Sequence, residues 1–212
     1  MIVMKPVVEV NGSAQFGLWP VEVLPDRTLL PLHGGLTPAE LGSAMLAIVS
    51  TNDNDPEEWP YPMPPRPADP LAGFLHGLLT IDSPEAYGGL RVTDTATGVV
   101  FDPACCDGVE DWRDWQRVVD GGELWYGHEP LSPHADGTGP LVRLTVNAED
   151  PASPAIELTH AALARLLGEV EQDLSDFLAL ADRWAQRQLP EPFAVPVTDA
   201  LARILSPGHP LG

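Results

Sequence analysis

The longest regular pattern of apolar and polar residues lies in the last third of the chain. Between about residues 160 and 188, apolar side chains recur every three or four positions, and charged side chains fall between them. Residues at this spacing share one face of an α-helix, so the pattern predicts an amphipathic helix of roughly 43 Å that follows Thr159. The apolar face consists of Leu163, Leu166, Leu167, Val170, Leu174, Phe177, Leu178, Ala181 and Trp184.

A second helix is predicted near the start of the chain. Thr37 and Glu40 have the spacing of a capping box, and Pro38 stands at the first helical position. Apolar residues then follow at helical spacing, which predicts a helix over about 38–50. Weaker patterns predict two further helices, over about 108–120 and Asp199–Leu205.

Strands are predicted where apolar and polar residues alternate, or where β-branched residues cluster between turn signals. Residues 1–10 are rich in Val and precede the turn signal Asn11-Gly12, so the segment 16–24 is predicted as the return strand of a hairpin. The polar segment 129–140 is predicted as a loop. The other predicted strands are Thr28–Leu32, Gly73–Ile81, Leu90–Asp94, Gly98–Asp102, Glu123–Gly127, Leu141–Val146 and Ala155–Leu158.

These elements mix helices and strands without a regular βαβ rhythm, which is typical of the α+β class. We expect a twisted, mainly antiparallel sheet that is packed by the helix over about 160–188. The chain, residues 1–212, is predicted to form a single domain. Prolines are frequent in two places, and there we expect an acidic loop at 52–70 and an extended C-terminal segment at 189–212.

Charge narrows the classes of partner. The 212 residues include 11 Lys and Arg against 31 Asp and Glu, which gives a formal net charge of −20. Nucleic acids and anionic membrane surfaces are bound mainly through basic side chains, so neither is expected as a partner. Two interpretations of the charge stay open: it keeps the protein soluble, or it attracts a basic protein.

The cytoplasm is the expected location. No apolar run reaches the roughly 18 to 20 residues of a membrane span. The first ten residues lack the basic and apolar regions of a secretory signal peptide.

Two acidic clusters are the candidate partner-binding residues. Around the first, aromatic side chains are interleaved with prolines and offer anchors for a partner. The second lies on the helix predicted over about 108–120. The candidates are Asp53, Asp55, Glu57, Glu58, Trp59 and Tyr61 in the first cluster, and Asp107, Glu110, Asp111 and Asp114 in the second.

The two cysteines, Cys105 and Cys106, suggest other chemistry. With His128 and His134 they supply four zinc-type ligands, but structural zinc sites normally separate their cysteines by two to four residues. Thiol catalysis needs a thiolate beside a base or at a helix N-terminus, and the acidic neighbours would raise the cysteine pKa values instead. No metal site and no cofactor are therefore expected, and two buried cysteines remain the simpler interpretation.

A resemblance supports a binding function. The stretch from Cys105 to Trp115, the Gly127-His-Glu-Pro130 turn and the Asp173–Leu178 helix segment resemble small acidic, uncharacterised proteins of high-GC bacteria. Some of those are similar to immunity proteins of toxin–immunity pairs. The resemblance implies a bacterial, cytoplasmic, protein-binding protein.

We therefore expect an acidic protein-binding protein, foremost an immunity-type inhibitor of a basic partner such as a toxin. Catalytic motifs such as Gly-x-Ser-x-Gly and His-Glu-x-x-His are absent from the sequence. One alternative is an enzyme or metal protein centred on Cys105, Cys106, His128 and His134. The other is an accessory subunit of a larger assembly that docks through the loop at 52–70.

Overall fold

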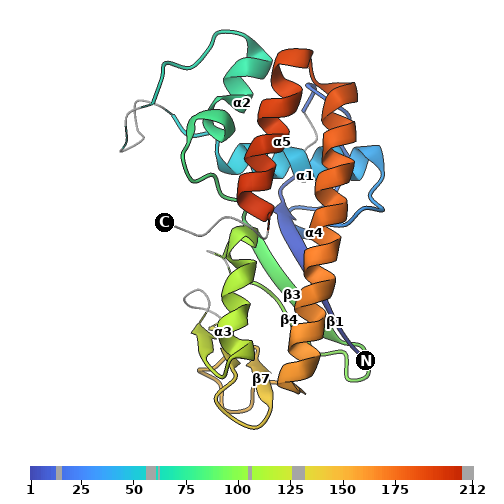
Figure 1. The fold of residues 1–212 in the computed structure, drawn as a ribbon, viewed down its shortest axis with the longest axis vertical. Coiled ribbons are helices and arrows are strands. Elements are labelled where there is room, and N and C mark those ends of the chain that lie inside the picture. The colour runs from blue at the N-terminus through green and yellow to red at the C-terminus, as the bar shows by residue number, and fades with distance from the viewer. Residues whose placement is uncertain (13–15, 56–60, 62, 105–106, 126–131, 207–212) are drawn as a thin grey trace. The chain divides into compact units, whose positions relative to one another are not determined.

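The chain forms two compact units, which we name the sheet unit and the helical unit. The computed structural model describes residues 1–12, 16–55, 61, 63–104, 107–125 and 132–206 (Figure 1). The sheet unit comprises Met1–Val7 and Tyr87–Asp173, and the helical unit comprises Val8–Ala86 and Leu174–Gly212. Strand β1 and helix α4 each contribute residues to both units.

The strands form two four-stranded sheets, where the sequence predicts one. The strand orders are β2-β1-β3-β4 and β5-β6-β7-β8. The strand pairs β3–β4, β5–β6, β6–β7 and β7–β8 are antiparallel. The strands are β1 (Ile2–Val10), β2 (Thr28–Pro31), β3 (Gly88–Asp94), β4 (Val100–Phe101), β5 (Glu123–Trp125), β6 (His134–Asp136), β7 (Val142–Thr145) and β8 (Ala155–Leu158).

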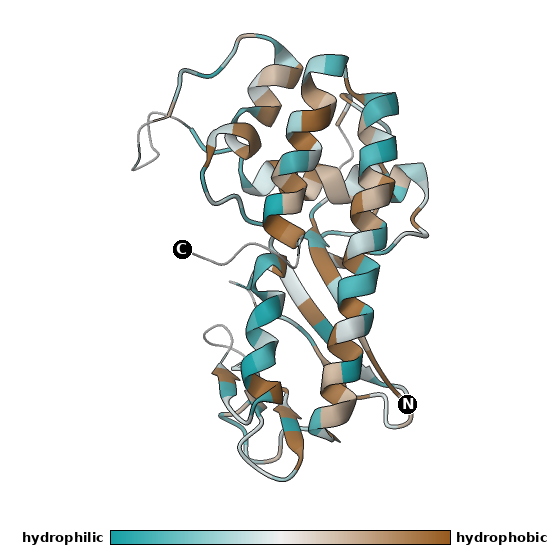
Figure 2. Cartoon of the chain, viewed as in Figure 1, coloured by the Kyte–Doolittle hydropathy of each residue, from teal (hydrophilic) through white to brown (hydrophobic). Residues whose placement is uncertain are grey.

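The helices confirm the α+β class and the longest predicted element. Helix α4 occupies His160–Gln188, as the spacing of its apolar residues predicts. Hydrophilic and hydrophobic residues alternate around it (Figure 2). The other helices are α1 (Pro38–Thr51), α2 (Pro70–Thr80), the 3₁₀ helix η1 (Val109–Asp114), α3 (Trp115–Val119) and α5 (Glu191–Leu205).

Helix α4 contributes to the core of both units through one stripe. In the sheet unit Leu163, Leu166 and Val170 are buried, and in the helical unit Leu174 and Phe177 are buried. Each of these five side chains is at most 1% exposed, so burial of about 1.5 to 3 kcal/mol per side chain stabilises the helix. The helix start is capped by Thr159, whose hydroxyl accepts a hydrogen bond from the N–H of Ala162.

The predicted capping box of α1 is confirmed. The hydroxyl of Thr37 accepts a hydrogen bond from the N–H of Glu40 at 3.2 Å, and a carboxylate oxygen of Glu40 accepts one from the N–H of Thr37 at 2.8 Å. Two donors at the helix end are thus satisfied by side chains. The helix runs one residue further than predicted, to Thr51.

The prediction of a strand at Gly73–Ile81 is wrong, because this segment belongs to helix α2. Asp69 caps the helix by accepting a hydrogen bond from the N–H of Ala72, and Pro70 stands at the first position. A short apolar run fits a buried helix as well as a buried strand, and the cap decides between them. Gly77 lets the helix approach Asn52 closely, since a Cβ there would lie 1.6 Å from the Asn52 carbonyl oxygen.

The segment 16–24 is not the predicted return strand. Its described backbone is irregular and packs on α1. The N–H of Glu22 donates to the carbonyl of Ala39 and to the hydroxyl of Ser43, and the indole of Trp19 donates to the carbonyl of Gly42. Pro20 cannot take part in a strand ladder as a donor, which is consistent with this arrangement. Strand β2 stands next to β1 instead.

The predicted helix over Asp199–Leu205 is confirmed, but it begins earlier, in residues 191–198, where an extended segment was predicted. Helix α5 covers Glu191–Leu205 and includes Pro192 and Pro196. Proline suits the first helical turn, because the donors there have no partner within the helix. Pro196 lies only slightly further in, so the lost hydrogen bond falls near the helix start.

Two predictions in the sheet unit also need correction. The helix predicted over about 108–120 is divided into the 3₁₀ helix η1 and the short helix α3. The loop predicted at 129–140 contains β6, which pairs with both β5 and β7. In the part of the chain that the structure describes, no helix is both long and apolar enough to cross a membrane.

Candidate functional site

The strongest candidate surface is the second acidic cluster, Asp107–Asp114, which we name the acidic segment. Its start is tied to the entry of β3: the N–H of Gly88 donates to the carbonyl of Asp107 at 3.0 Å, and Tyr87 forms a β-bridge with Gly108. The Asp107 carboxylate accepts a hydrogen bond from the N–H of Ala104 at 2.6 Å. Local turn hydrogen bonds therefore position the first carboxylate.

Apolar residues hold the segment on the sheet unit. Val109, Trp112, Trp115 and Val118 are buried along η1 and α3. The Trp115 ring packs edge-on against Phe101, with 5.9 Å between ring centroids. The intervening carboxylates are therefore presented outward, and Asp111 and Asp114 are exposed.

The carboxylates of the segment act on one another. Partial burial, with a contribution from the charge of Asp111, raises the pKa of Asp107 from 3.8 to about 6. Although the Asp111 side chain is exposed at its surface, partial desolvation by its neighbours, followed by the charge of Asp114, also raises the pKa of Asp111. Burial is the main cause of both shifts, and the neighbouring like charges add to it, because both disfavour the ionised carboxylate.

Arg113 belongs to the acidic segment in sequence, but its side chain contacts Trp112 and not the carboxylates of the segment. Its guanidinium carbon lies 5.1 Å from the centroid of the Trp112 ring. Burial lowers the pKa of Arg113, and the charge that opposes this effect is that of Glu171 on α4. Its Nε and Nη2 atoms are buried and have no hydrogen-bond partner among the described residues. No ion pair joins Arg113 to Asp107, Asp111 or Asp114 in the described part of the chain.

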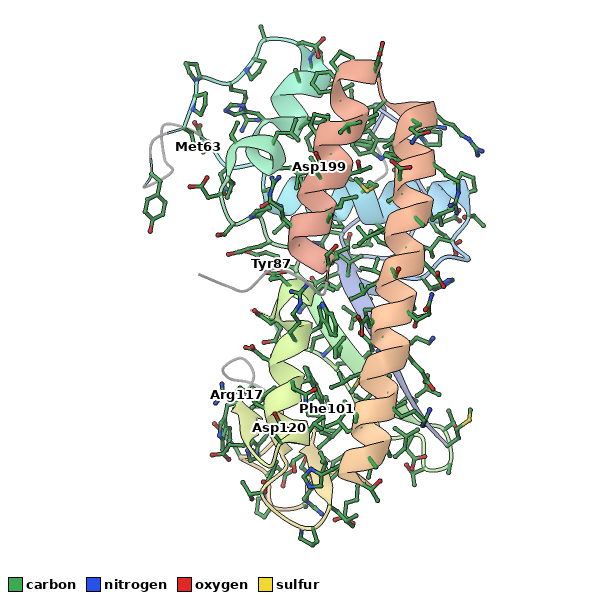
Figure 3. The ribbon with its side chains drawn as sticks, viewed as in Figure 1. Met63, Tyr87, Phe101, Arg117, Asp120 and Asp199 are labelled. Carbon is green, nitrogen blue, oxygen red and sulfur yellow. The ribbon has the colours of Figure 1, made fainter. Side chains whose placement is uncertain are left out.

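An exposed aromatic side chain stands at the edge of the acidic segment. Tyr87, which bridges Gly108 through its backbone, is 49% exposed (Figure 3). Tyrosine is enriched at protein interfaces because it offers a large apolar ring and a hydroxyl together. Sequence reasoning overlooked Tyr87, since only the β-bridge brings it to the acidic segment.

The first acidic cluster belongs to the helical unit, and part of it lies outside the described residues. Asp53 accepts a hydrogen bond from Arg66 at 2.5 Å, so its charge has an internal partner. Asp55 is exposed, and Tyr61 is 69% exposed. The candidates Glu57, Glu58 and Trp59 are outside the described residues. The structure therefore supports the second cluster more directly than the first.

Of the four residues in the metal or thiol alternative, only His134 is described. Cys105, Cys106 and His128 lie outside the described residues. The His134 ring stacks on Trp125 with 3.7 Å between centroids, and its Nε2 atom lies 3.0 Å from a carboxylate oxygen of Glu123. Both contacts join β6 to β5. Among the described residues, no three His, Cys, Asp or Glu side chains are grouped closely enough to hold a metal ion.

A hollow in the helical unit was not foreseen from the sequence. It has a volume of about 200 Å³ and lies beside the start of α1 and the last turns of α4. The arginines Arg183 and Arg187 line it, together with Trp184. Their spacing on a predicted helix was a usable signal, because residues four apart share a face.

Comparisons with known proteins give no relative. A scan against protein-family models, a search of curated proteins and a search of solved structures found no match.

Proposed function

We propose that the chain is an acidic protein-binding protein, an immunity-type inhibitor of a basic partner such as a toxin, and that it binds through the acidic segment and Tyr87. The observation that carries the proposal is the exposure of unpaired carboxylates: Asp111 and Asp114 are exposed, and neither has an ion-pair partner in the described part of the chain. Burial, with a smaller contribution from neighbouring negative charge, raises the pKa values of Asp107 and Asp111. A lysine or arginine of a partner would pair with these carboxylates.

The net charge of −20 supports the same proposal, because it would increase the rate at which a basic protein associates with this chain. Complementary potentials accelerate association by about ten- to a thousandfold, and salt reduces the effect because the Debye length is about 8 Å at physiological ionic strength. The same charge disfavours nucleic acid as a partner, because it repels phosphates. A basic protein remains the best match in charge.

Tyr87 would supply the anchor that charge alone does not. Interfaces usually contain a few desolvated aromatic or arginine side chains that account for most of the binding free energy. Tyr87 is half exposed, and its β-bridge to Gly108 places it beside the acidic segment. We therefore expect Tyr87→Ala to raise the dissociation rate, whereas loss of charge lowers the association rate.

The proposal also specifies a pH dependence. A cationic partner favours the charged carboxylate, so binding lowers the pKa of Asp107 from about 6 and releases a proton. Binding should be tighter at pH 7.5 than at pH 5.5. Calorimetry in buffers of different ionisation enthalpy measures the released proton directly.

The test begins with the immobilised chain and a lysate of the host organism. The captured protein is purified, and its association rate is measured by surface plasmon resonance over a series of salt concentrations. The double variant Asp111→Asn/Asp114→Asn removes two charges from the acidic segment. The matched control Glu191→Gln/Asp199→Asn removes two charges from exposed positions of α5, where Asp199 is labelled in Figure 3.

The expected result is a basic partner whose association slows with salt and with the first variant but not with the control. Equal rates for the two variants, or a rate that does not depend on salt, would refute the proposed surface. Failure to recover any basic protein would count against the function itself.

A further inference from the structure

The hollow in the helical unit combines an apolar interior with a cationic rim. Leu36 and Leu41 from the start of α1 and Leu180 and Trp184 from α4 form the apolar wall. Leu36, Leu41 and Trp184 are otherwise buried, at 7%, 1% and 5% exposure. Arg183 and Arg187 also line the hollow and are exposed to solvent, and Pro38 and Gln188 complete the lining.

The wall is held in place by an aromatic cluster. Trp184 packs edge-on against Trp19 with 5.5 Å between ring centroids, and Trp19 also contacts Phe16 and Phe74. The indole N–H of Trp19 donates to the carbonyl of Gly42 at 2.9 Å. A rigid wall of this kind keeps a hollow open, because closely packed side chains do not collapse into it.

The indole of Trp184 differs from that of Trp19 in one respect. Its Nε1 atom is buried and has no hydrogen-bond partner among the described residues. Buried donors are nearly always paired, because an unpaired buried donor loses its hydrogen bonds to water without replacement. The orphaned donor thus lies on the one residue that is both in the aromatic cluster and in the lining of the hollow.

Arg183 and Arg187 have no ion-pair partner within the described part of the chain. Their guanidinium groups are therefore available to a ligand, although the chain has almost three times as many acidic as basic residues. Two carboxylates near them, one on α1 and one on α4, accept hydrogen bonds from other residues. Glu40 accepts from Thr37, and Asp182 accepts from Gln186.

We propose that the hollow binds a small organic monocarboxylate with an apolar body, an aryl or medium-chain acid. The body would lie on Leu36, Leu41 and Trp184, and the carboxylate would accept hydrogen bonds from the two guanidinium groups. Arginine suits this role because its planar group can donate two parallel hydrogen bonds to one carboxylate. The start of α1 adds a favourable partial positive charge.

The lining of the hollow suits a ligand with a single negative charge better than a ligand with several. The apolar wall matches a hydrocarbon body, whereas a phosphate ester of a sugar would leave polar groups against leucine side chains. The net charge of −20 also penalises an anion of higher charge more strongly than a monoanion. This proposal is independent of the acidic segment, which belongs to the other unit.

The experiment uses octanoate and indole-3-acetate as probes, with 1-octanol and indole-3-acetamide as uncharged analogues. Binding to the full chain is measured by calorimetry and by ligand-observed NMR. The variant Arg183→Gln/Arg187→Gln removes the rim charges. The matched control is Arg117→Gln/Arg203→Gln, which removes two exposed arginines that also have no ion-pair partner among the described residues.

We expect the acids to bind at least tenfold more tightly than their uncharged analogues. We also expect the rim variant to lose about tenfold or more in affinity, while the control retains the affinity of the unmodified chain. Leu36→Trp, which fills the hollow, should abolish binding of both acids. Equal affinity of acid and analogue, equal affinity of the two arginine variants, or no binding at millimolar concentration would each overturn the proposal.

Discussion

In the acidic segment of the sheet unit, Asp111 and Asp114 are exposed beside a partly buried Asp107, and like charges act on one another. In the hollow of the helical unit, Arg183 and Arg187 are exposed beside a buried tryptophan. Most other basic residues, such as Lys5, are paired with carboxylates. Net charge therefore does not predict the sign of a local surface, because ion pairing within the fold determines which charges remain unpaired.

The two regions also differ in what supports them. The acidic segment lies on a 3₁₀ helix and a helix of only five residues. The hollow lies between the start of α1 and the long helix α4. Short helices are marginal by themselves, so the acidic segment depends on Val109, Trp112 and Trp115 for its position.

The largest expected effect tests the packing of α4 in both regions. Phe177→Ala in the helical unit should lower the free energy of unfolding by about 3–5 kcal/mol, and Leu166→Ala in the sheet unit by about 2–5 kcal/mol, because each leaves a cavity. Urea denaturation measures both. Ser175→Ala, at an exposed position of the same helix, is the control. An unchanged midpoint for Phe177→Ala would contradict the described core.

Two glycine substitutions should have opposite signs. Gly77→Ala should destabilise the protein by about 1–3 kcal/mol, because a Cβ would lie 1.6 Å from the carbonyl oxygen of Asn52. Gly168→Ala on α4 should stabilise it by about 0.5–1 kcal/mol, because no atom lies within 4 Å of the added Cβ. Thermal denaturation of the pair distinguishes a close helix contact from an open helix surface, and the same sign for both would contradict the geometry.

A smaller effect concerns Asp107. Its pKa in the folded state is raised from 3.8 to about 6, so the folded state holds the proton more tightly than the unfolded state. The stabilising contribution is present below about pH 4 and is lost as pH rises to about 6. Asp107→Asn should therefore gain stability relative to the unmodified chain between pH 4 and pH 7, by about 1 kcal/mol after allowance for solvent screening. A difference that does not change with pH would contradict the raised pKa.

The smallest expected effect separates folding from binding at the rim of the hollow. Arg187 lies in the last turn of α4, where a positive charge favours the helix end. Arg187→Gln should lower the free energy of unfolding by about 0.3–1 kcal/mol, and Arg183→Gln by less. A loss of several kcal/mol in thermal denaturation would show that these arginines serve the fold instead of a ligand.

Part of the fold could be predicted from sequence patterns that involve residues close together in the chain. The extent of α4 could be predicted because a single apolar stripe continues over 29 residues without a breaker. The capping box of Thr37 and Glu40 located the start of α1 for a similar reason, since both partners are close in sequence. Helix α2 was missed because its apolar run is short, although Asp69 and Pro70 were available as a start signal.

The candidate surfaces followed from the sequence only in part. The acidic residues could be identified by type, but their effects on one another required the positions that β3 and the buried tryptophans give them. Tyr87 lies beside the acidic residues because of its β-bridge to Gly108, which is 21 positions later in the sequence. No local sequence pattern predicts such a pairing. The hollow required α1 and α4 together, and these helices are far apart in sequence.

The α+β class, the long helix, the capped helix α1 and the excess of negative charge could all be predicted from the amino-acid sequence. These properties depend on composition and on residues within a few turns of one another. The pairing of charges, the order of the strands and the tryptophan donor that has no partner among the described residues became known only from the folded chain. Such properties depend on contacts between distant segments, where burial and hydrogen bonding outweigh the modest preferences of individual residues.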